Sequence, residues 1–368
     1  MSKRPVRIDQ VIPSIVERDA VSRHTMEAQK LLRSMGYVSE IFACTWGAEM
    51  EGRVRPLKDL PRDAGGGQWI CYQASIGSPA ASAVAEHPAP KIVDYHNITP
   101  TELVDRWMPA LGEEVRLGRK QLAELAPMVE LAVGDSAFNC AELDSWGYRR
   151  TQVSSLMMDL SSFGRPADTV LAEALADVKQ GGGVDWLFVG QMLPHKAQQD
   201  VVKAFACYLK LYDPLARLHL IGRPSCGEYA LAVRRFVEAL GIGASVNIAG
   251  SVTPQELVAY YGAADVLVCC SDHEGFGAPL LEAMHQGIPL VAYDTAAVGE
   301  TVLDAGIVLS SKQPCLVATA AHRVVSDLGL REMLVDRGRQ RARAFTLDAS
   351  RDAFAAAIEA AVGAGHGA

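Results

Sequence analysis

Hydrophobic and polar positions alternate between two patterns along the chain. Short β-branched or apolar runs, typical of buried strands, are followed by longer stretches with apolar residues at helical spacing. One series runs from a predicted strand at 6–12 and a predicted helix at 20–35 to a strand near 151–156. The pattern restarts with a strand at 185–190 and ends with a strand at 288–292. Strands that alternate with helices in this way predict parallel sheets with helices on both faces. The other expected strands are 38–43, 69–73, 91–95, 129–133, 216–222, 245–249 and 265–269, and the other expected helices are 113–127, 137–146, 196–211, 227–240, 254–263 and 279–286.

The pattern divides the chain into two domains. Residues 161–185, between the two series, contain Pro166 and the run Gly181–Gly183, and we interpret them as a linker. We therefore expect an α/β protein with two doubly wound, Rossmann-like domains, residues 1–165 and residues 166–348 including the linker. Ligands bind such sheets beyond the carboxyl ends of the strands. Two such domains facing each other predict an active site in the cleft between them.

Composition and charge narrow the possible partners. The chain has 368 residues, of which 49% are hydrophobic and 21% charged, as in an ordinary folded protein. With 35 basic and 43 acidic residues, the net charge is −8. The chain therefore lacks the basic excess that binding to nucleic acid or docking on anionic lipid requires. No apolar stretch is long enough for a signal peptide or a membrane span. The eight cysteines form neither a CxxC pair nor a zinc-like spacing, so we expect reduced thiols in a cytoplasmic protein with small-molecule partners.

The segment 265–293 is the part of the sequence that points most clearly to a ligand-binding site. A predicted strand is followed by the loop SDHEGFG and by a helix that begins near Ala278. The glycines allow close approach of a ligand, and the amides of Phe276, Gly277 and Ala278 then form an anion site suited to a diphosphate. The carboxylates of Glu274 and Glu282 flank this site, and they are expected to accept hydrogen bonds from sugar or ribose hydroxyls. The alternative is a tight turn in which Glu282 only complements the helix dipole.

This segment resembles the family-4 retaining glycosyltransferases of the GT-B fold, whose E-x7-E signature is met by Glu274 and Glu282. The resemblance covers about 120 residues of the second half, including LFVGQMLPHKAQQDVVKAF and GIPLVAYDTAAVGETV. It implies transfer of a sugar from a nucleotide-diphosphate sugar with retention at the anomeric carbon. It also implies that Glu274 contacts the donor sugar and Glu282 the ribose, and that a last helix, 349–364, crosses back onto the N-terminal domain.

The resemblance also assigns residues to the diphosphate and the base. Lys196 matches a family lysine that grips the diphosphate, but Gln191 stands where the family usually has an arginine. Arg223, at another strand end, is a candidate to compensate for that difference. VNIAGSVTPQEL resembles the strip that binds the base, so the backbone near Val252 is expected to contact it.

The N-terminal half provides the expected acceptor side. His96 and Asn97 follow a buried strand, and family members often have a histidine there that contacts the donor sugar. Asp19 either caps the following helix or hydrogen-bonds an acceptor hydroxyl. Ser75, in another loop at a strand end, is expected to line the acceptor side.

We therefore expect a retaining glycosyltransferase with Glu274, Lys196 and His96 as catalytic residues. No Asp-x-Asp pair occurs in the sequence, which favours transfer without a metal or other cofactor. An inactive donor-binding subunit of a biosynthetic complex and a sugar-nucleotide epimerase remain alternatives. The acceptor class stays open between glycans, lipid-linked glycans and small molecules, and a lipid-linked one would place the protein at the inner membrane face.

Overall fold

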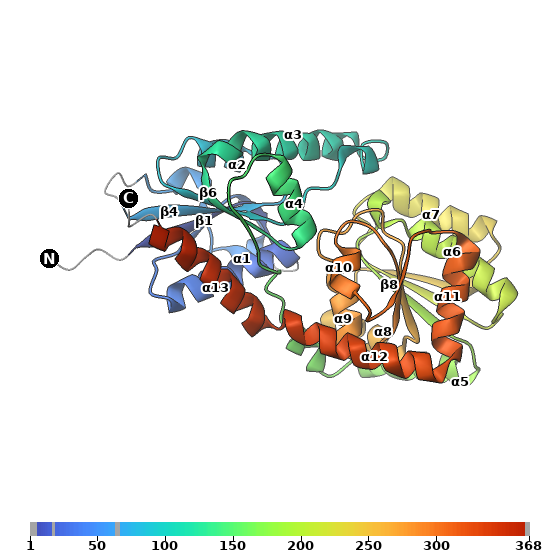
Figure 1. The fold of residues 1–368 in the computed structure, drawn as a ribbon. Helices are drawn as coiled ribbons and strands as arrows, with labels where there is room; N and C mark the ends of the chain where they lie inside the picture. Colours follow the sequence, from blue (N-terminus) through green and yellow to red (C-terminus); the bar gives the residue numbers. More distant parts are fainter. Residues whose placement is uncertain (1–5, 17–18, 63–66, 365–368) are drawn as a thin grey trace. The chain divides into compact units, whose positions relative to one another are not determined.

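The computed structural model describes residues 6–16, 19–62 and 67–364, which form two compact units (Figure 1). The N-terminal unit comprises residues 1–105, 109–159 and 345–368, and the C-terminal unit comprises residues 106–108 and 160–344. Each unit is built on one parallel sheet, so the predicted α/β class with two Rossmann-like domains is confirmed. Among the described residues, no helix combines the length and hydropathy that crossing a bilayer would require.

The sheet of the N-terminal unit has seven parallel strands in the order β3-β2-β1-β4-β5-β6-β7. All residues of the central strands β4 and β5 are buried, because helices cover both faces of the sheet. The strands are β1 (Arg7–Ile15), β2 (Ile41–Trp46), β3 (Arg55–Pro56), β4 (Gln68–Ala74), β5 (Lys91–Tyr95), β6 (Val129–Gly134) and β7 (Thr151–Val153).

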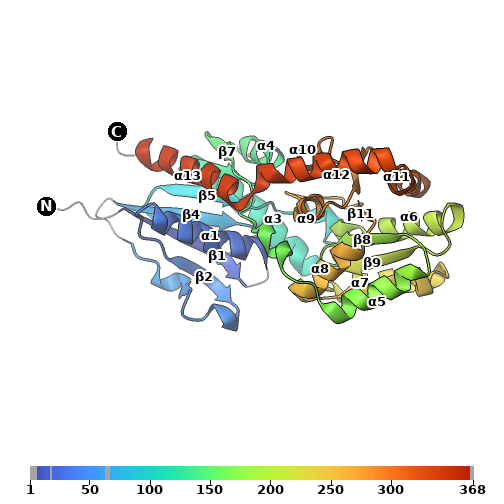
Figure 2. The same cartoon turned by 90° about the horizontal axis from the view of Figure 1, so that it is seen from below.

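Two groups of helices cover this sheet. On one face, α1 (Ala20–Ser34) and α13 (Leu347–Ala364) pack side by side, and their residues Ala28, Leu32 and Phe354 share a core with Ile8 and Ile92 of the sheet. Figure 2 shows these two helices along the same face. The other face is covered by α2 (Pro79–Ala85), α3 (Pro109–Leu125) and α4 (Ala137–Ser145).

The sheet of the C-terminal unit has six parallel strands in the order β10-β9-β8-β11-β12-β13. The strands are β8 (Asp185–Val189), β9 (Arg217–Ile221), β10 (Val246–Gly250), β11 (Val266–Cys269), β12 (Leu290–Tyr293) and β13 (Ile307–Leu309). The helices are α5 (Thr169–Gln180), α6 (Gln198–Leu211), α7 (Gly227–Ala239), α8 (Pro254–Ala263), α9 (Ala278–Gln286), α10 (Val298–Val302), α11 (Pro314–Ser326) and α12 (Leu328–Ala342). The core on one face is centred on Trp186 of β8, whose ring makes edge contacts with Phe205 and Tyr208 of α6.

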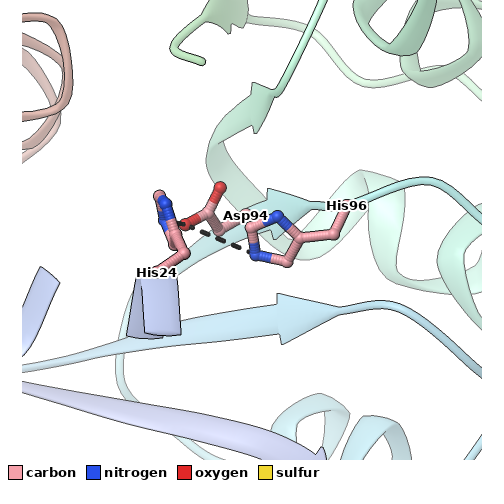
Figure 3. A group of neighbouring side chains, drawn as sticks. All are labelled: His24, Asp94 and His96. Carbon is pink, nitrogen blue, oxygen red and sulfur yellow. Dashed lines mark hydrogen bonds and ion pairs between the residues drawn. The ribbon is translucent and has the colours of Figure 1, made fainter. Parts of the chain in front are cut away.

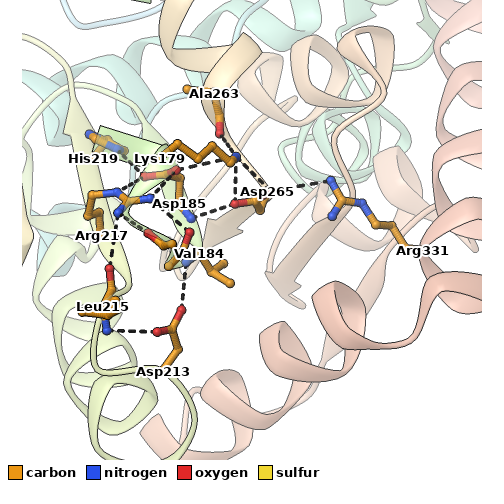
Figure 4. Close-up of polar contacts among 12 residues, drawn as sticks. Lys179, Val184, Asp185, Asp213, Leu215, Arg217, His219, Ala263, Asp265 and Arg331 are labelled. Carbon is orange, nitrogen blue, oxygen red and sulfur yellow. Dashed lines mark hydrogen bonds and ion pairs between the residues drawn. The ribbon is translucent and has the colours of Figure 1, made fainter. Parts of the chain in front are cut away.

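A network of charged side chains ties together the amino ends of β8, β9 and β11 (Figure 4). The Arg217 guanidinium donates to both carboxylate oxygens of Asp185, at 2.6 and 2.9 Å, and His219 lies 3.1 Å from the same group. Lys179 of α5 donates to Asp265, which in turn accepts the backbone N–H of Asp185 at 2.9 Å. These contacts fasten α5 to the amino ends of the strands, whereas ligands of such sheets bind beyond the carboxyl ends.

The segment expected to be a linker is partly helical. Within 161–185, residues Thr169–Gln180 form α5, which begins at the cap Asp168 and packs on α8. The Asp168 carboxylate accepts the N–H of Leu171 at 2.8 Å. The interpretation of this segment as linker alone was therefore wrong: it supplies a helix to the C-terminal unit.

Candidate functional site

Lys196 and Glu274, both expected to be catalytic, meet at the carboxyl end of the C-terminal sheet. Lys196 ends the 3-10 turn Pro194–Lys196 after β8, and Ala197 then takes a left-handed conformation, with φ of 49°, before α6 begins. The Lys196 Nζ donates to Glu274 Oε2 at 2.7 Å. Their side chains are only 21% and 10% exposed. A cation and a carboxylate that the sequence separates by 78 positions are thus paired in a sheltered place.

Several contacts hold the loop that carries Glu274. The N–H of Asp272 donates to the carbonyl of His195 at 2.7 Å, which joins this loop to the one carrying Lys196. The Glu274 carbonyl accepts the N–H of Ala297 at 3.0 Å. Lys312 pairs with Asp272 and also, at 2.8 Å, with Asp200 in the first turn of α6. These protein contacts hold the loop in a defined position.

The predicted anion site lies at the start of α9. Gly277 precedes this helix with φ of 83°, a conformation that favours glycine, and an added Cβ would lie 2.8 Å from Leu280 Cδ1. The Phe276 carbonyl accepts the hydroxyl of Thr301 at 2.8 Å. Pro279 occupies the first turn of α9, where a proline is tolerated. The first amides of a helix have no carbonyl partner within it, so the amide of Ala278 contributes positive potential here.

Glu282 is buried within α9 and has a protein partner. The hydroxyl of Tyr261, on α8, donates to Glu282 Oε2 at 2.7 Å. Burial raises the pKa of Tyr261, and the carboxylate raises it further, so the hydroxyl remains a donor. No pattern in the sequence pointed to Tyr261 as a residue of the site. This bond fixes the orientation of the Glu282 carboxylate, and its expected contact with the ribose stays a prediction.

Gln191 and Arg223 lie together where β8 and β9 end. Gln191 Oε1 accepts the hydroxyl of Ser225 at 2.6 Å and lies 3.5 Å from the Arg223 guanidinium. The loops approach so closely that a Cβ on Gly222 would lie 1.9 Å from the carbonyl oxygen of Gly190. Arg223 therefore lies beside Gln191, which occupies the position where the family usually has an arginine.

The predicted base-binding strip follows β10. The N–H of Gly222 donates to the Gly250 carbonyl at 2.9 Å, so the ends of β9 and β10 are neighbours. Val252 lies two residues beyond Gly250, just before α8. Thr253 starts α8 with a capping box: its hydroxyl accepts the N–H of Glu256, whose carboxylate accepts the N–H of Thr253.

In the N-terminal unit, His96 belongs to a buried hydrogen-bond network rather than to an open surface. Its Nδ1 lies 3.1 Å from both oxygens of Asp135, and its Nε2 lies 2.6 Å from Gln73 Oε1. The His96 ring is fully buried. Contact between this ring and a sugar would require one of these bonds to break.

The proton positions in this network follow from its fixed ends. The Thr25 carbonyl can only accept a hydrogen bond, so the Gln10 side chain must turn its NH2 group toward it. Gln10 Oε1 then accepts from the NH2 group of Gln73. This leaves Gln73 Oε1 as an acceptor for His96 Nε2. Both His96 nitrogens therefore donate. Burial alone would lower the pKa of His96, but the carboxylates of Asp135 and Asp94 outweigh it and raise that pKa to about 9.

His24, Asp94 and His96 form a compact group whose spacing would suit a metal ion (Figure 3). Their protonation does not suit one. His24 Nδ1 accepts the N–H of Met157 at 3.0 Å, so its proton is on Nε2 and points at Asp94, 2.9 Å away. With His24 and His96 both holding protons on the ligand atoms, the group acts as a salt-linked network. Asp94 was not among the expected site residues, although a carboxylate within the apolar strand KIVDY was a signal for it.

The expected acceptor residues lie at the carboxyl ends of neighbouring strands in this unit. Asp19 caps α1, and its carboxylate accepts both the N–H and the hydroxyl of Ser22. Ser75 directly follows β4. Asn97 follows β5 in a left-handed conformation, with φ of 71°, and donates to Asn139 at 2.8 Å. The cap role of Asp19 is confirmed, and its contact with an acceptor stays a prediction.

Comparison with known proteins identifies the C-terminal unit. Residues 177–341 match the family Glycosyl transferases group 1. A D-inositol 3-phosphate glycosyltransferase of Salinispora arenicola is 30% identical over 211 residues, which are 54% of this chain and 47% of that protein. One of Acidothermus cellulolyticus is 32% identical over 178 residues, 46% of this chain and 39% of that protein. The chain spans about half the length of the curated relatives it matches.

Solved structures extend the likeness in fold to both units. Alr3699/HepE of Anabaena, in complex with UDP and glucose, has a TM-score of 0.77 at 15% identity and covers 96% of this chain and 100% of its own. Sucrose-phosphate synthase of Thermosynechococcus elongatus has a TM-score of 0.76 at 17% identity, covering 97% and 100%. The fold is therefore GT-B, and residues 177–341 of the C-terminal unit are similar to the glycosyl transferases group 1 family.

Proposed function

We propose that this protein is a retaining glycosyltransferase that moves a sugar from a nucleotide-diphosphate sugar to an acceptor hydroxyl. The observation that carries the proposal is the Lys196–Glu274 pair: Lys196 Nζ, in the turn after β8, lies 2.7 Å from Glu274 Oε2, in the loop that leads into α9. The group 1 match and the relatives named as glycosyltransferases support it. The structural neighbour that binds UDP and glucose supports a nucleotide sugar as donor.

The roles of the site residues follow from charge. Lys196, Arg223 and the first amides of α9 stabilise the negative charge that develops on the departing diphosphate. Glu274 and Glu282, which a phosphate would repel, accept hydrogen bonds from hydroxyls of the sugar and of the ribose. The acceptor hydroxyl attacks from the face that the diphosphate leaves and passes its proton to a phosphate oxygen, which preserves the anomeric configuration.

We further propose that transfer needs neither a metal nor another cofactor and takes place in the cytoplasm. The cations and helix amides of the C-terminal unit supply the positive potential that a divalent ion would otherwise provide. Turnover should therefore survive a chelator. Loss of turnover in chelator that returns with Mg²⁺ or Mn²⁺ would contradict this part of the proposal.

The acceptor side is assigned to the loops that carry Asp19, Ser75 and Asn97. The relatives named for D-inositol 3-phosphate make phosphorylated polyols one class for an acceptor panel, beside glycans and lipid-linked glycans.

The test combines donor binding with turnover. A panel of nucleotide sugars should contain one that raises the melting temperature by mass action and is consumed with an acceptor to give a product of the same anomeric configuration. Lys196→Ala and Glu274→Ala should abolish transfer while the protein stays folded. Lys203→Ala and Glu238→Ala are matched controls, because both residues are exposed on helices of the same unit, and they should transfer normally.

Gln191 favours one alternative, an inactive subunit that binds the donor. A charge-assisted hydrogen bond contributes roughly 1.5–3 kcal/mol, so loss of the usual arginine costs about tenfold to a hundredfold in rate unless Arg223 replaces it. Binding of a nucleotide sugar with neither transfer nor slow hydrolysis would support the inactive subunit. Release of a free sugar epimer would instead indicate an epimerase.

A further inference from the structure

Two cysteines on neighbouring helices of the C-terminal unit face each other at the surface. Cys207 lies in the second half of α6, and Cys315 is the second residue of α11. Their Sγ atoms are 3.3 Å apart. Cys315 is exposed and Cys207 is partly exposed, so a small reagent can reach the pair. The donor site uses neither residue.

Contacts on both sides hold the two thiols in place. Toward the start of the helices, Lys312 pairs with Asp200 of α6 at 2.8 Å. Toward their ends, the hydroxyl of Tyr212 hydrogen-bonds that of Thr319 at 2.8 Å. The ring of Tyr212 also stacks on that of His322, with centroids 4.1 Å apart. The seam between α6 and α11 is therefore fixed on either side of the cysteines, and the thiols cannot drift apart without breaking it.

We propose that Cys207 and Cys315 are a redox-sensitive thiol pair that forms a reversible disulfide between α6 and α11. A disulfide places its sulfurs about 2.05 Å apart, so the pair must close by roughly 1.3 Å. Changes in side-chain torsion angles produce such a movement more easily than a shift of packed helices does.

The step requires an oxidant, and a low-molecular-weight disulfide supplies it. The thiolate of Cys315, the more exposed residue, attacks one sulfur of the reagent, which breaks the reagent's S–S bond and releases one thiolate. The Cys207 thiolate then attacks Cys315 Sγ, displaces the second thiolate and forms the protein disulfide. Two protein thiols are oxidised and one reagent disulfide is reduced to two thiols, so protons and electrons balance.

The other cysteines do not compete for the reagent. Five of them are buried: Cys71, Cys140, Cys226, Cys269 and Cys270. Their burial keeps a disulfide reagent from reaching the sulfurs, whereas Cys315 is exposed. Cys44 is partly exposed but lies in the N-terminal unit, so it serves as a matched control.

The disulfide would act as a staple on the donor-binding unit. It would close a loop between positions 108 residues apart, and long loops gain most from closure. It would also restrict the movement of Lys312, which lies at the start of this seam. Lys312 pairs with Asp272, two residues before Glu274 in the donor-site loop. A rise in melting temperature of roughly 5 °C is expected for a staple of this kind.

Glutathione disulfide tests the proposal on the full-length protein. After incubation, non-reducing digestion and mass spectrometry should show the peptides of Cys207 and Cys315 joined, with no glutathione attached. Dithiothreitol should reverse both the link and the rise in melting temperature. Cys44→Ser should leave the link intact. Cys207→Ser should leave glutathione attached to Cys315, because the resolving thiol is missing.

Three results would overturn the proposal. The first is that both thiols stay free under conditions that oxidise a model dithiol. The second is that the wild-type protein keeps glutathione on Cys315. The third is that the link forms but lowers the melting temperature. The first two exclude the pair as a disulfide site, and the third excludes it as a staple.

Discussion

At the scale of single residues, Arg223 carries the first prediction. Its guanidinium lies 3.5 Å from Gln191 Oε1, so it stands beside the position where the family usually has an arginine. Arg223→Ala should lower kcat/KM by about tenfold to a hundredfold, since one charge-assisted hydrogen bond to the diphosphate is lost. Steady-state kinetics with a saturating acceptor measure this loss.

A second substitution separates compensation from a structural effect. If Arg223 replaces the missing arginine, then Gln191→Arg should restore most of the activity lost in Arg223→Ala. Gln191→Arg alone should change activity little. Failure of the double variant to recover, in a protein that melts normally, would show that Arg223 does not serve the diphosphate.

His96 carries a prediction about stability and pH. Its pKa is raised to about 9 in the folded protein, mainly by Asp135 and Asp94 against the effect of burial, whereas an unfolded histidine titrates near 6.5. The stabilisation is therefore complete below about pH 6.5 and is lost as the pH rises through about 9. Linkage gives a fall in the free energy of unfolding on the order of 3 kcal/mol, measurable by chemical denaturation.

The matched control for His96 is another histidine. His96→Gln should remove most of this dependence between pH 6.5 and 9, because the amide does not titrate. His285→Gln, at an exposed position on α9, should retain it. An unchanged slope in the His96 variant would contradict the cationic assignment.

Single residues also mark the limit of what the sequence predicts. The resemblance to the family pointed to Glu274 and Lys196, and the cap Asp19 followed from local chemistry. The Tyr261–Glu282 bond could not be predicted, because it joins residues 21 positions apart through the packing of α8 on α9. Partners set by tertiary packing leave no local pattern in the sequence.

At the scale of elements, the amino-end network predicts how the C-terminal sheet responds to acid. Arg217 and His219 outweigh the effect of burial and lower the pKa of Asp185 to about 2, from 3.8. This stabilisation is present above about pH 4 and is lost as the pH falls through about 2. Allowing for solvent screening, it contributes about 1–2 kcal/mol.

Asp185→Asn should lower the free energy of unfolding at pH 7 and weaken its dependence on pH between 4 and 2. Denaturant titrations across this range measure both effects. Asp177→Asn, at an exposed position on α5, is the control and should behave as wild type. Equal acid sensitivity in both variants would mean that other carboxylates dominate.

Helices with a strong periodic pattern were predicted well. The bounds of strands, which depend on pairing with a neighbouring strand, were predicted less well. The predicted helices at 20–35 and 254–263 became α1 and α8 with nearly the same bounds. The strand expected at 38–43 instead spans Ile41–Trp46, because Val38 makes only an isolated bridge to Arg7. Apolar character shows that a strand exists, but its register with β1 sets where it begins.

At the scale of the whole molecule, most of the net negative charge lies in the half that is expected to bind an anionic donor. Residues 1–165 carry 19 basic and 21 acidic side chains, so the remaining residues hold six of the eight net negative charges. The part expected to bind an anionic diphosphate is thus the more acidic one. Binding must depend on a few local groups, Lys196, Arg223 and the start of α9, rather than on the overall field of the protein.

The two units have separate cores, which leads to the last prediction. Phe354 of α13 and Phe205 of α6 are both fully buried, one in each unit. Either change to alanine should cost about 3–5 kcal/mol of stability. Phe354→Ala should leave the affinity for the nucleotide sugar within about twofold of wild type at a temperature where the protein stays folded. Phe205→Ala should weaken that affinity more, since Phe205 lies in α6, which begins two residues after Lys196. Calorimetric titration of both variants decides this, and equal losses of affinity would show that donor binding depends on both cores.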